Sequence, residues 1–184
     1  MVNLGDLIAG NIHLTIRLNS RINVIKQIMD VSELLTELIV DLSNYCKIYY
    51  YDTLDNHSRI EPIRENSLEL ESLACLTSWY LQARLDASKQ EFPVYIKKNV
   101  YSPDIITFDV LGHSVAGVHG HKDKPEKVVD NLILMTKQDY DLILTSHLHH
   151  FSCDEKNDVL VVSNSSLMGT DDYAAKLRLS AKPS

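Results

Sequence analysis

Apolar residues repeat at helical spacing between Ile22 and Leu42. The polar pair Asn19-Ser20 comes just before the repeat, and such side chains can cap the free amides of a first helical turn. We therefore predict one long helix after this pair. The residues expected to form its buried stripe are Ile22, Ile25, Ile28, Met29, Leu35, Leu38, Ile39 and Leu42.

Short strands and a second helix are predicted before residue 100. Val2 to Leu4 and the aromatic run Cys46 to Tyr51 have the composition of strands, and residues 52–63 have that of a loop. A second helix is expected over Leu68 to Leu85, and Pro93 prevents it from continuing. Its predicted apolar stripe consists of Leu68, Leu73, Leu76, Trp79, Tyr80 and Ala83.

In the second half of the chain, the sequence pattern predicts a hairpin and then a helix between further strands. Residues 104–119 should form the hairpin, with a turn at residues 111–114. A helix is expected from Pro125 towards Gln138, strands at residues 141–145 and 159–162, and a plain turn at residues 154–158. Because helices alternate with short apolar strands, we predict a layered α/β or α+β fold.

Composition limits the size and the partners of this fold. The chain has 184 residues, of which 45% are hydrophobic, enough for one core, so we predict a single domain over residues 1–184. Its formal net charge of -7 argues against a generally basic surface for nucleic acid. A phosphate group must then be attracted locally, for example by a bound divalent ion.

Cysteine usage and hydropathy point to the cytoplasm. Cys46, Cys75 and Cys153 are odd in number and lack paired spacing, so we expect core thiols in a reducing compartment rather than disulfides. No apolar run approaches the roughly 20 residues that cross a bilayer, and the N-terminus does not resemble a secretion signal. We therefore expect no membrane partner and a cytoplasmic location.

Four short motifs lie where a predicted strand ends and a loop begins. They are Gly5-Asp6, Asp55-Asn56-His57, His119-Gly120-His121 and His147-Leu148-His149. Carboxylate, amide oxygen and imidazole are suitable ligands for a divalent transition metal. In open α/β sheets, the ends of strands are also where ligands generally bind.

The motifs differ in how much each one indicates. Gly5-Asp6 and Asn56-His57 are weak alone, because Asp and Asn are common in turns and His is common on surfaces. His147-x-His149 is stronger, although a solvated histidine cluster remains an alternative. His119-Gly120-His121 repeats the same design, with Gly120 permitting a close approach of the backbone. Two such strand-end pairs favour a metal site.

The ordered set of motifs resembles the calcineurin-like metallophosphoesterase family, over Gly5 to His149. The resemblance implies an αββα sandwich that hydrolyses phosphomonoesters or phosphodiesters with two metal ions. Within the family, the chain looks most like bacterial and phage proteins described as DNA repair exonucleases or phosphohydrolases. A phosphoester substrate, nucleic acid included, is thus the expected partner.

The resemblance also assigns roles to individual residues. Asp6 matches the carboxylate that bridges the two metals, and His57 matches the histidine that protonates the leaving oxygen or steadies the transition state. The other expected ligands are Asn56, His119 and His147 for the second metal and His149 for the first. Manganese is the preferred ion, and nickel, zinc, iron and cobalt are alternatives. Two ions about 3.5 to 4 Å apart can clamp a phosphoryl group and activate water.

The chain departs from the family pattern at its start. The family normally has an Asp-x-His motif one β-α unit before Gly-Asp, whereas only Met1 to Leu4 precede Gly5 here. We therefore expect a sandwich that lacks its first β-α unit and binds as few as one ion. Smaller departures are Asp55 and Ser146 at positions where the family has Gly, and Ser58 where it has an acid.

Two hypotheses follow. The favoured one is an N-terminally shortened metal-dependent phosphoesterase, and the other is a natural, non-catalytic remnant that binds metal or self-associates to cover the incomplete sheet. Substrate and physiological metal stay open. Several other residues are expected outside the site, as surface, core or solvated side chains: His13, His113, His121, His150, Lys122, Lys124 and Lys127.

Overall fold

The computed structural model describes residues 1–168 of the chain, which has an α/β fold. It contains two compact units, residues 1–98 and residues 99–184, the second described as far as residue 168. Each unit has its own sheet, with α2 and α3 packed against the first sheet and α4 against the second, which confirms a layered α/β fold with two sheets. A single domain over residues 1–184 stays a prediction.

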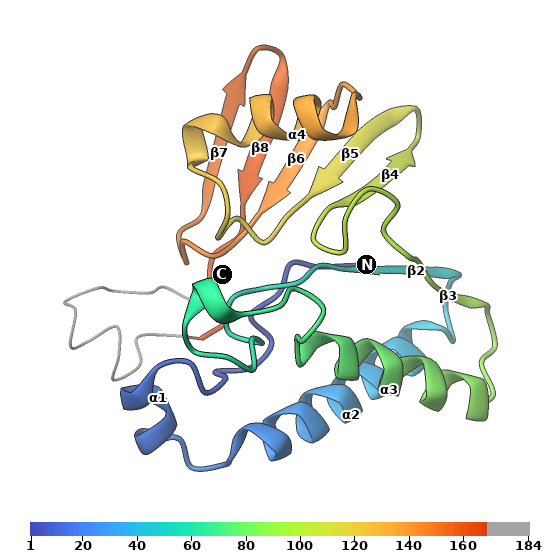
Figure 1. The fold of residues 1–184 in the computed structure, drawn as a ribbon. Helices are drawn as coiled ribbons and strands as arrows, with labels where there is room; N and C mark the ends of the chain where they lie inside the picture. The colour runs from blue at the N-terminus through green and yellow to red at the C-terminus, as the bar shows by residue number, and fades with distance from the viewer. Residues whose placement is uncertain (169–184) are drawn as a thin grey trace. The chain divides into compact units, whose positions relative to one another are not determined.

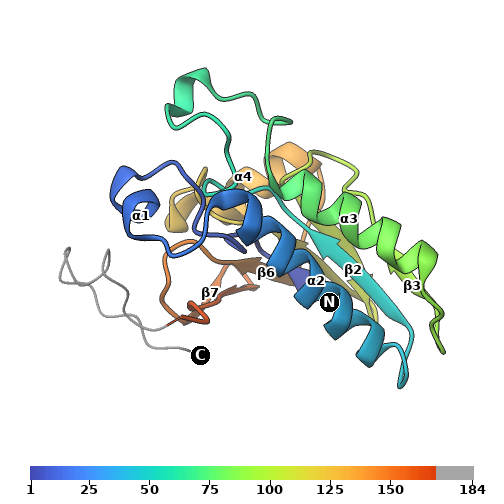
Figure 2. The same ribbon diagram turned by 90° about the horizontal axis from the view of Figure 1, so that it is seen from below.

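The first unit is built on a three-stranded parallel sheet in the order β1-β2-β3. Helices α2 and α3 run side by side against it (Figure 2). Their shared core consists of Ile39, Ile48, Tyr50, Leu81 and Leu85. The elements are β1 (Val2–Asn3), α1 (Leu14–Asn19), α2 (Val24–Leu42), β2 (Ile48–Asp52), η1 (Arg64–Asn66), α3 (Ala74–Ala87) and β3 (Val94–Ile96).

The long helix begins later than predicted. Asn23 caps α2, because its side chain accepts a hydrogen bond of 2.9 Å from the amide of Lys26. Asn19, expected just before this helix, instead ends the separate short helix α1. Similarly, the second helix begins at Ala74 rather than Leu68, and β3 was not predicted.

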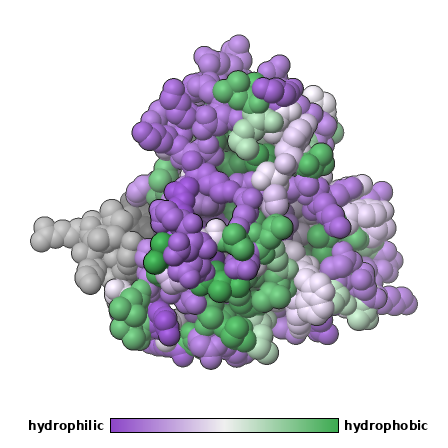
Figure 3. Space-filling view, in the orientation of Figure 1, coloured by the Kyte–Doolittle hydropathy of each residue, from purple (hydrophilic) through white to green (hydrophobic). Residues whose placement is uncertain are grey.

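The predicted apolar stripes of α2 and α3 were wrong in part. Ile28, Leu35 and Ile39 of α2 are buried as expected. Polar Ser32 and Thr36 share that buried face, and Thr77 is buried on α3. Figure 3 shows apolar side chains on the surface of the part formed by α1, α2 and α3. The exposed ones from the predicted stripes are Ile22, Ile25, Met29, Leu38, Leu42, Leu68, Leu76, Trp79 and Ala83.

The second unit contains a five-stranded sheet in the order β4-β5-β6-β8-β7. Strands β5, β6 and β8 are parallel neighbours, whereas β4 and β7 run antiparallel at the edges. Helix α4 lies against one face of this sheet (Figure 1), and Val129 and Leu132 pack on Ile143. The elements are β4 (Ile106–Val110), β5 (His113–Gly117), η2 (Pro125–Lys127), α4 (Val128–Thr136), β6 (Leu142–Thr145), β7 (Ser152–Lys156) and β8 (Val159–Ser163).

The hairpin of the second unit is confirmed, and one predicted turn is corrected. β4 and β5 pair antiparallel around Leu111-Gly112, both of which have positive φ. The turn is thus shorter than the predicted residues 111–114, because His113 and Ser114 already pair with β4. Residues 154–158, predicted as a plain turn, largely belong to β7. The turn to β8 is confined to Asn157 and Asp158, whose φ values of 51° and 62° are typical of a tight hairpin. β7 lies at the edge of the sheet and carries charged residues, which is common for edge strands. It therefore lacks the apolar pattern by which strands were predicted.

Two further expectations have clear outcomes. Cys46, Cys75 and Cys153 are all exposed, so the prediction of core thiols was wrong. None of the helices in residues 1–168 combines the length and apolar composition that a bilayer crossing requires. A cytoplasmic location stays a prediction. The sequence also predicts a frayed end over residues 174–184, which lie outside the described residues.

Candidate functional site

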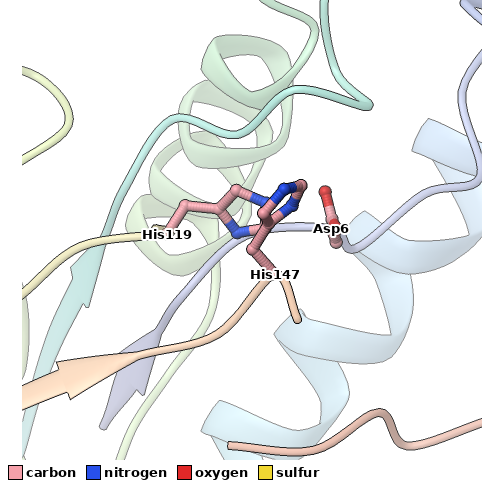
Figure 4. Close-up of side chains that lie close together, drawn as sticks. All are labelled: Asp6, His119 and His147. Carbon is pink, nitrogen blue, oxygen red and sulfur yellow. The ribbon is translucent and has the colours of Figure 1, made fainter. Parts of the chain in front are cut away.

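His119 and His147 follow the carboxyl ends of two adjacent parallel strands, β5 and β6. Beyond the paired residues, the amide of Val118 donates to the carbonyl of Leu144 at 3.0 Å, and that of Ser146 donates to the carbonyl of His119 at 3.1 Å. These bonds continue the register past the strand ends, so both histidines leave the sheet at the same level. Figure 4 shows the two imidazoles, whose ring centroids are 5.0 Å apart.

The hydroxyl of Ser146 determines which nitrogen of His119 is available for a ligand. Ser146 Oγ lies 2.9 Å from Nδ1 of His119 and 3.1 Å from its carbonyl oxygen. A carbonyl only accepts, so one arrangement satisfies both contacts: the hydroxyl donates to the carbonyl and accepts from Nδ1–H. Nε2 of this buried histidine then carries the lone pair that could bind a metal.

The two motifs of the second unit also place His121 and His149 at this end of the sheet. The ring centroid of His121 lies 5.3 Å from that of His119 and 6.2 Å from that of His147, and His149 is exposed. Gly120 has a φ of 104°, which disfavours any side chain. A Cβ there would lie 3.4 Å from the Ser146 carbonyl, an ordinary contact, so this φ rather than a close backbone approach explains the glycine.

The two motifs of the first unit occupy an equivalent position on their own sheet. Asp6 follows β1 and Asn56-His57 follows β2, and these strands are adjacent and parallel, with Asn3 paired to Asp52. The side chain of Asn3 accepts the amide of Gly5 at 3.0 Å and so shapes the turn that presents Asp6. The half-buried Asp6 carboxylate is also labelled in Figure 4.

Three of the predicted metal ligands have a strained backbone. Asp6, His147 and His149 have φ values of 52°, 68° and 56°. In residues 1–168, seven non-glycine residues have positive φ, and the other four lie in hairpin turns or at the end of α4. Side chains in the left-handed region cost free energy, and such strain clusters at functional sites. This geometry is therefore evidence of a functional constraint that is independent of residue type.

Asn56 and His57 lie in a tight turn that Asp55 and Ser58 close. The guanidinium Nε of Arg59 donates to the carbonyl of Asn56 at 3.1 Å. Nδ1 of His57 lies 2.8 Å from the carbonyl oxygen of Ala9. The ring centroid of His13, which we expected outside the site, is 5.5 Å from that of His57.

Within each unit, the two motifs therefore lie at the same edge of the sheet, and in the second unit the rings of His119, His121 and His147 lie close together. Their roles as ligands or as catalyst stay predictions. The sequence did not reveal the contacts made by His13, Ser146 and His121, and nothing in their spacing could have done so. Lys122, which we expected outside the site as a solvated side chain, forms an ion pair of 2.7 Å with Asp104.

Comparisons with known proteins found similarity only among solved structures. No family model matches the chain, and no curated protein matches it. A structure described as a novel archaeal phosphodiesterase is 15% identical, with 78% of each chain covered and a TM-score of 0.39. Vps29 from Chaetomium thermophilum is 16% identical, with a TM-score of 0.41, and covers 92% of this chain and 72% of its own.

A third similar structure contains a metal ion. It is Vps29 from Entamoeba histolytica in complex with zinc, 15% identical, with a TM-score of 0.37. The match covers 72% of this chain and 66% of that one. At such identities and TM-scores these matches carry no information on activity, which we argue from the residues of this chain.

Proposed function

We propose that the chain is a metal-dependent phosphoesterase that cleaves phosphodiesters, with DNA ends as the leading substrate class. The carrying observation is that all four motifs follow the carboxyl ends of adjacent parallel strands, two motifs in each unit. Such strand ends are the usual ligand-binding position of α/β sheets. The residues assigned to metal binding are Asp6, Asn56, His119, His147 and His149.

The donor groups at these strand ends suit a divalent transition metal. Imidazole nitrogens together with carboxylate and amide oxygens favour manganese, iron, zinc or nickel over calcium, which prefers oxygen ligands alone. The contact of Ser146 with Nδ1 of His119 leaves Nε2 as the nitrogen that can bind a metal. Histidine ligands typically donate their other ring N–H to a nearby acceptor in this way. Manganese is our preferred ion.

In this proposal His57 performs the proton transfer. A leaving oxygen develops negative charge as its bond to phosphorus breaks, and an imidazolium near neutral pH can donate a proton to it. With Nδ1 held by the Ala9 carbonyl, Nε2 is the nitrogen that donates. Divalent ions, when bound, polarise the phosphoryl oxygen and activate the attacking water. They also offset the net charge of -7, which would otherwise repel a phosphate.

The test combines metal content with hydrolysis. After loading with manganese, elemental analysis should find one or two ions per chain, and bis(p-nitrophenyl) phosphate should be hydrolysed. His147→Ala should lower both metal content and turnover, whereas His57→Ala should lower turnover by roughly 100-fold or more with metal retained. His113→Ala is the matched control, because His113 is an exposed histidine at the amino end of β5. Absence of both metal and turnover would contradict the proposal.

The substrate class is tested separately. Linear single-stranded and double-stranded oligonucleotides should be shortened from an end, whereas closed circular DNA should persist. Cleavage of circles would indicate an endonuclease, and hydrolysis limited to small aryl esters would indicate a different phosphoester substrate.

A second candidate function is a self-associating interaction module. It is favoured by the apolar side chains exposed on α2 and α3, among them Met29, Leu38, Leu76 and Trp79. Exposed apolar patches of this kind often mark protein interfaces. Light scattering after size exclusion should then report an oligomer that Leu38→Glu dissociates, while a strictly monomeric protein would eliminate this candidate.

A further inference from the structure

The segment between Asp6 and α1 is anchored to α2 by one buried side chain. The amide of Gly10 donates to Oε1 of Gln27 at 3.1 Å, in a buried hydrogen bond. The amide nitrogen of the same side chain, Nε2, donates to the hydroxyl of Ser20 at 3.2 Å and to the carbonyl of Ile22 at 3.1 Å. Gln27 therefore uses both ends of its amide to tie residues 10–22 to the helix, which restricts where this segment can lie.

This anchored segment contacts His57 through its backbone. The carbonyl oxygen of Ala9 lies 2.8 Å from Nδ1 of the imidazole, across 48 positions in the sequence. A Cβ built on Gly10 would lie 2.0 Å from the carbonyl oxygen of His57, closer than real Cβ atoms approach backbone. Gly10 also has a φ of 71°, which disfavours a side chain. The two segments thus pack at a distance that only glycine permits.

The contact with the Ala9 carbonyl determines which nitrogen of the His57 ring carries a proton. A backbone carbonyl only accepts, so Nδ1 must carry a proton for this hydrogen bond to form. In the neutral ring, Nε2 is then the nitrogen with a lone pair, and in the cation the same Nδ1–H bond persists. The contact therefore keeps one ring orientation in both protonation states and leaves proton exchange to Nε2.

The imidazole of His13 lies beside the His57 ring. The two rings are tilted by 60° to each other. Burial lowers the pKa of His13, and the neighbouring His57 and Arg59 lower it further. A neutral ring at this position packs against His57 without repelling an imidazolium there.

We propose that Ala9, Gly10 and Gln27 form a positioning element for His57, which fixes the Nδ1–H tautomer and the orientation of the imidazole. The inference rests on the proposed function for the use of His57, but the state of the ring can be measured without any catalysis. Gly10 and Gln27 act through His57 and are positioning residues. Hydrogen-bond partners that orient a functional histidine commonly influence activity by roughly 10- to 100-fold, as they do for metal-binding histidines.

The variants separate positioning from general stability. Gln27→Met keeps the length of the side chain but removes the acceptor for the Gly10 amide, and Gln27→Glu keeps an acceptor and serves as the conservative variant. Gly10→Ala forces the two backbones apart. Thr36→Val is the matched control, because Thr36 is another buried polar residue of α2, and its hydroxyl donates to the carbonyl of Ser32 at 2.8 Å.

The first readout is the ring itself. Long-range ¹H–¹⁵N spectra of the histidine-labelled full chain without added metal, at about pH 8.5 and so well above the usual histidine pKa of about 6.5, report the tautomer. His57→Gln identifies the signal. We expect the Nδ1–H form in the parent chain and in Thr36→Val, and a mixture of tautomers in Gln27→Met and Gly10→Ala. An averaged tautomer in the parent chain, or an unchanged one in a folded Gln27→Met, would overturn the proposal.

The second readout is kinetic, with manganese and bis(p-nitrophenyl) phosphate. Gln27→Met should lower kcat by roughly 10- to 100-fold with little change in KM, Gln27→Glu should recover part of the loss, and Thr36→Val should behave as the parent. An equal loss of kcat in Thr36→Val would show that the loss arises from lower stability of the fold, and would contradict a positioning role for Gln27. If the tautomers behave as expected but the parent chain has no turnover, positioning is supported and the proposed function fails.

Discussion

The carboxylate of Asp55 accepts two hydrogen bonds from Ser58, one of 2.7 Å from its amide and one of 2.9 Å from its hydroxyl. Both residues are buried, and Asn56 and His57 lie between them. These two positions are departures from the pattern of the resembling family, which has Gly before Asn-His and an acid after it. The departures are complementary in this chain, because the acid now precedes the pair and binds the residue that follows it. Asp55 and Ser58 thus close the turn that presents Asn56 and His57.

Breaking this turn should cost stability in proportion to the bonds removed. Asp55→Ala removes both bonds and should destabilise the chain by about 2 kcal/mol, and Ser58→Ala should cost about 1 kcal/mol, since bonds to charged acceptors are the stronger ones. Urea unfolding measures both. Glu61→Ala is the control, because its carboxylate accepts the amide of Ile63 at 3.1 Å in an exposed bond. Equal effects for Asp55→Ala and Glu61→Ala would contradict a structural role for the buried turn.

The hydroxyl of Ser146 should influence metal binding through His119. Ser146→Ala and Ser146→Gly remove the group that fixes Nδ1–H, so metal affinity should fall roughly 10- to 100-fold. Ser146→Thr, which keeps the hydroxyl, should retain affinity. Isothermal titration with manganese or zinc measures this, with Ser114→Ala at the opposite end of β5 as control. Unchanged affinity in Ser146→Ala would show that the hydroxyl does not orient the ligand.

The pair formed by Asp104 and Lys122 should make stability depend on pH. Burial alone would raise the pKa of Asp104, but hydrogen bonds from Lys122 and Ser102 and the positive charge of Lys122 lower it below its usual value of 3.8. A lowered folded-state pKa means that the unfolded chain binds the proton more readily, so acid favours unfolding. The contribution is fully present above 3.8 and is lost as the pH falls through the lowered value.

Asp104→Asn should therefore destabilise the chain by about 1 kcal/mol at pH 7 and by less in acid. Thermal unfolding followed from pH 7 down to about pH 3 tests this, across the usual range of carboxyl titration. Asp109→Asn, at an exposed position of the neighbouring strand β4, should leave the profile unchanged. If Asp104→Asn had the same profile as the parent chain, the partly exposed ion pair would not contribute to stability.

Two leucines of α4 should respond differently to the same substitution. Leu132 is 1% exposed in the core of the second unit, whereas Leu134 is 64% exposed on the same helix. Leu132→Ala should lower the free energy of unfolding by about 2–5 kcal/mol, since it leaves a cavity, while Leu134→Ala should change it by at most about 0.5 kcal/mol. Chemical denaturation measures both. A large loss in Leu134→Ala would indicate that this face is covered in solution.

The sequence alone was sufficient for features that depend on near neighbours. Helical periodicity predicted α2 and α4, and the hairpin was evident from two apolar runs around Leu111-Gly112. All four motifs could be placed after strands because strand composition and loop chemistry are local properties. The same local view failed at β7, whose charges belong to an edge strand, and at Asn19, whose capping chemistry suited a helix start that Asn23 in fact provides.

Which residues meet across the fold depended on tertiary packing. The exposed Leu38 and buried Thr36 of α2 show that hydropathy alone did not determine which side chains of the helix are buried. His57 meets Ala9 across 48 positions, and Ser146 meets His119 across 27, contacts that no spacing rule encodes. Such contacts form because parallel strands bring their carboxyl ends together and buried polar groups require partners, two constraints that act only once the chain has folded.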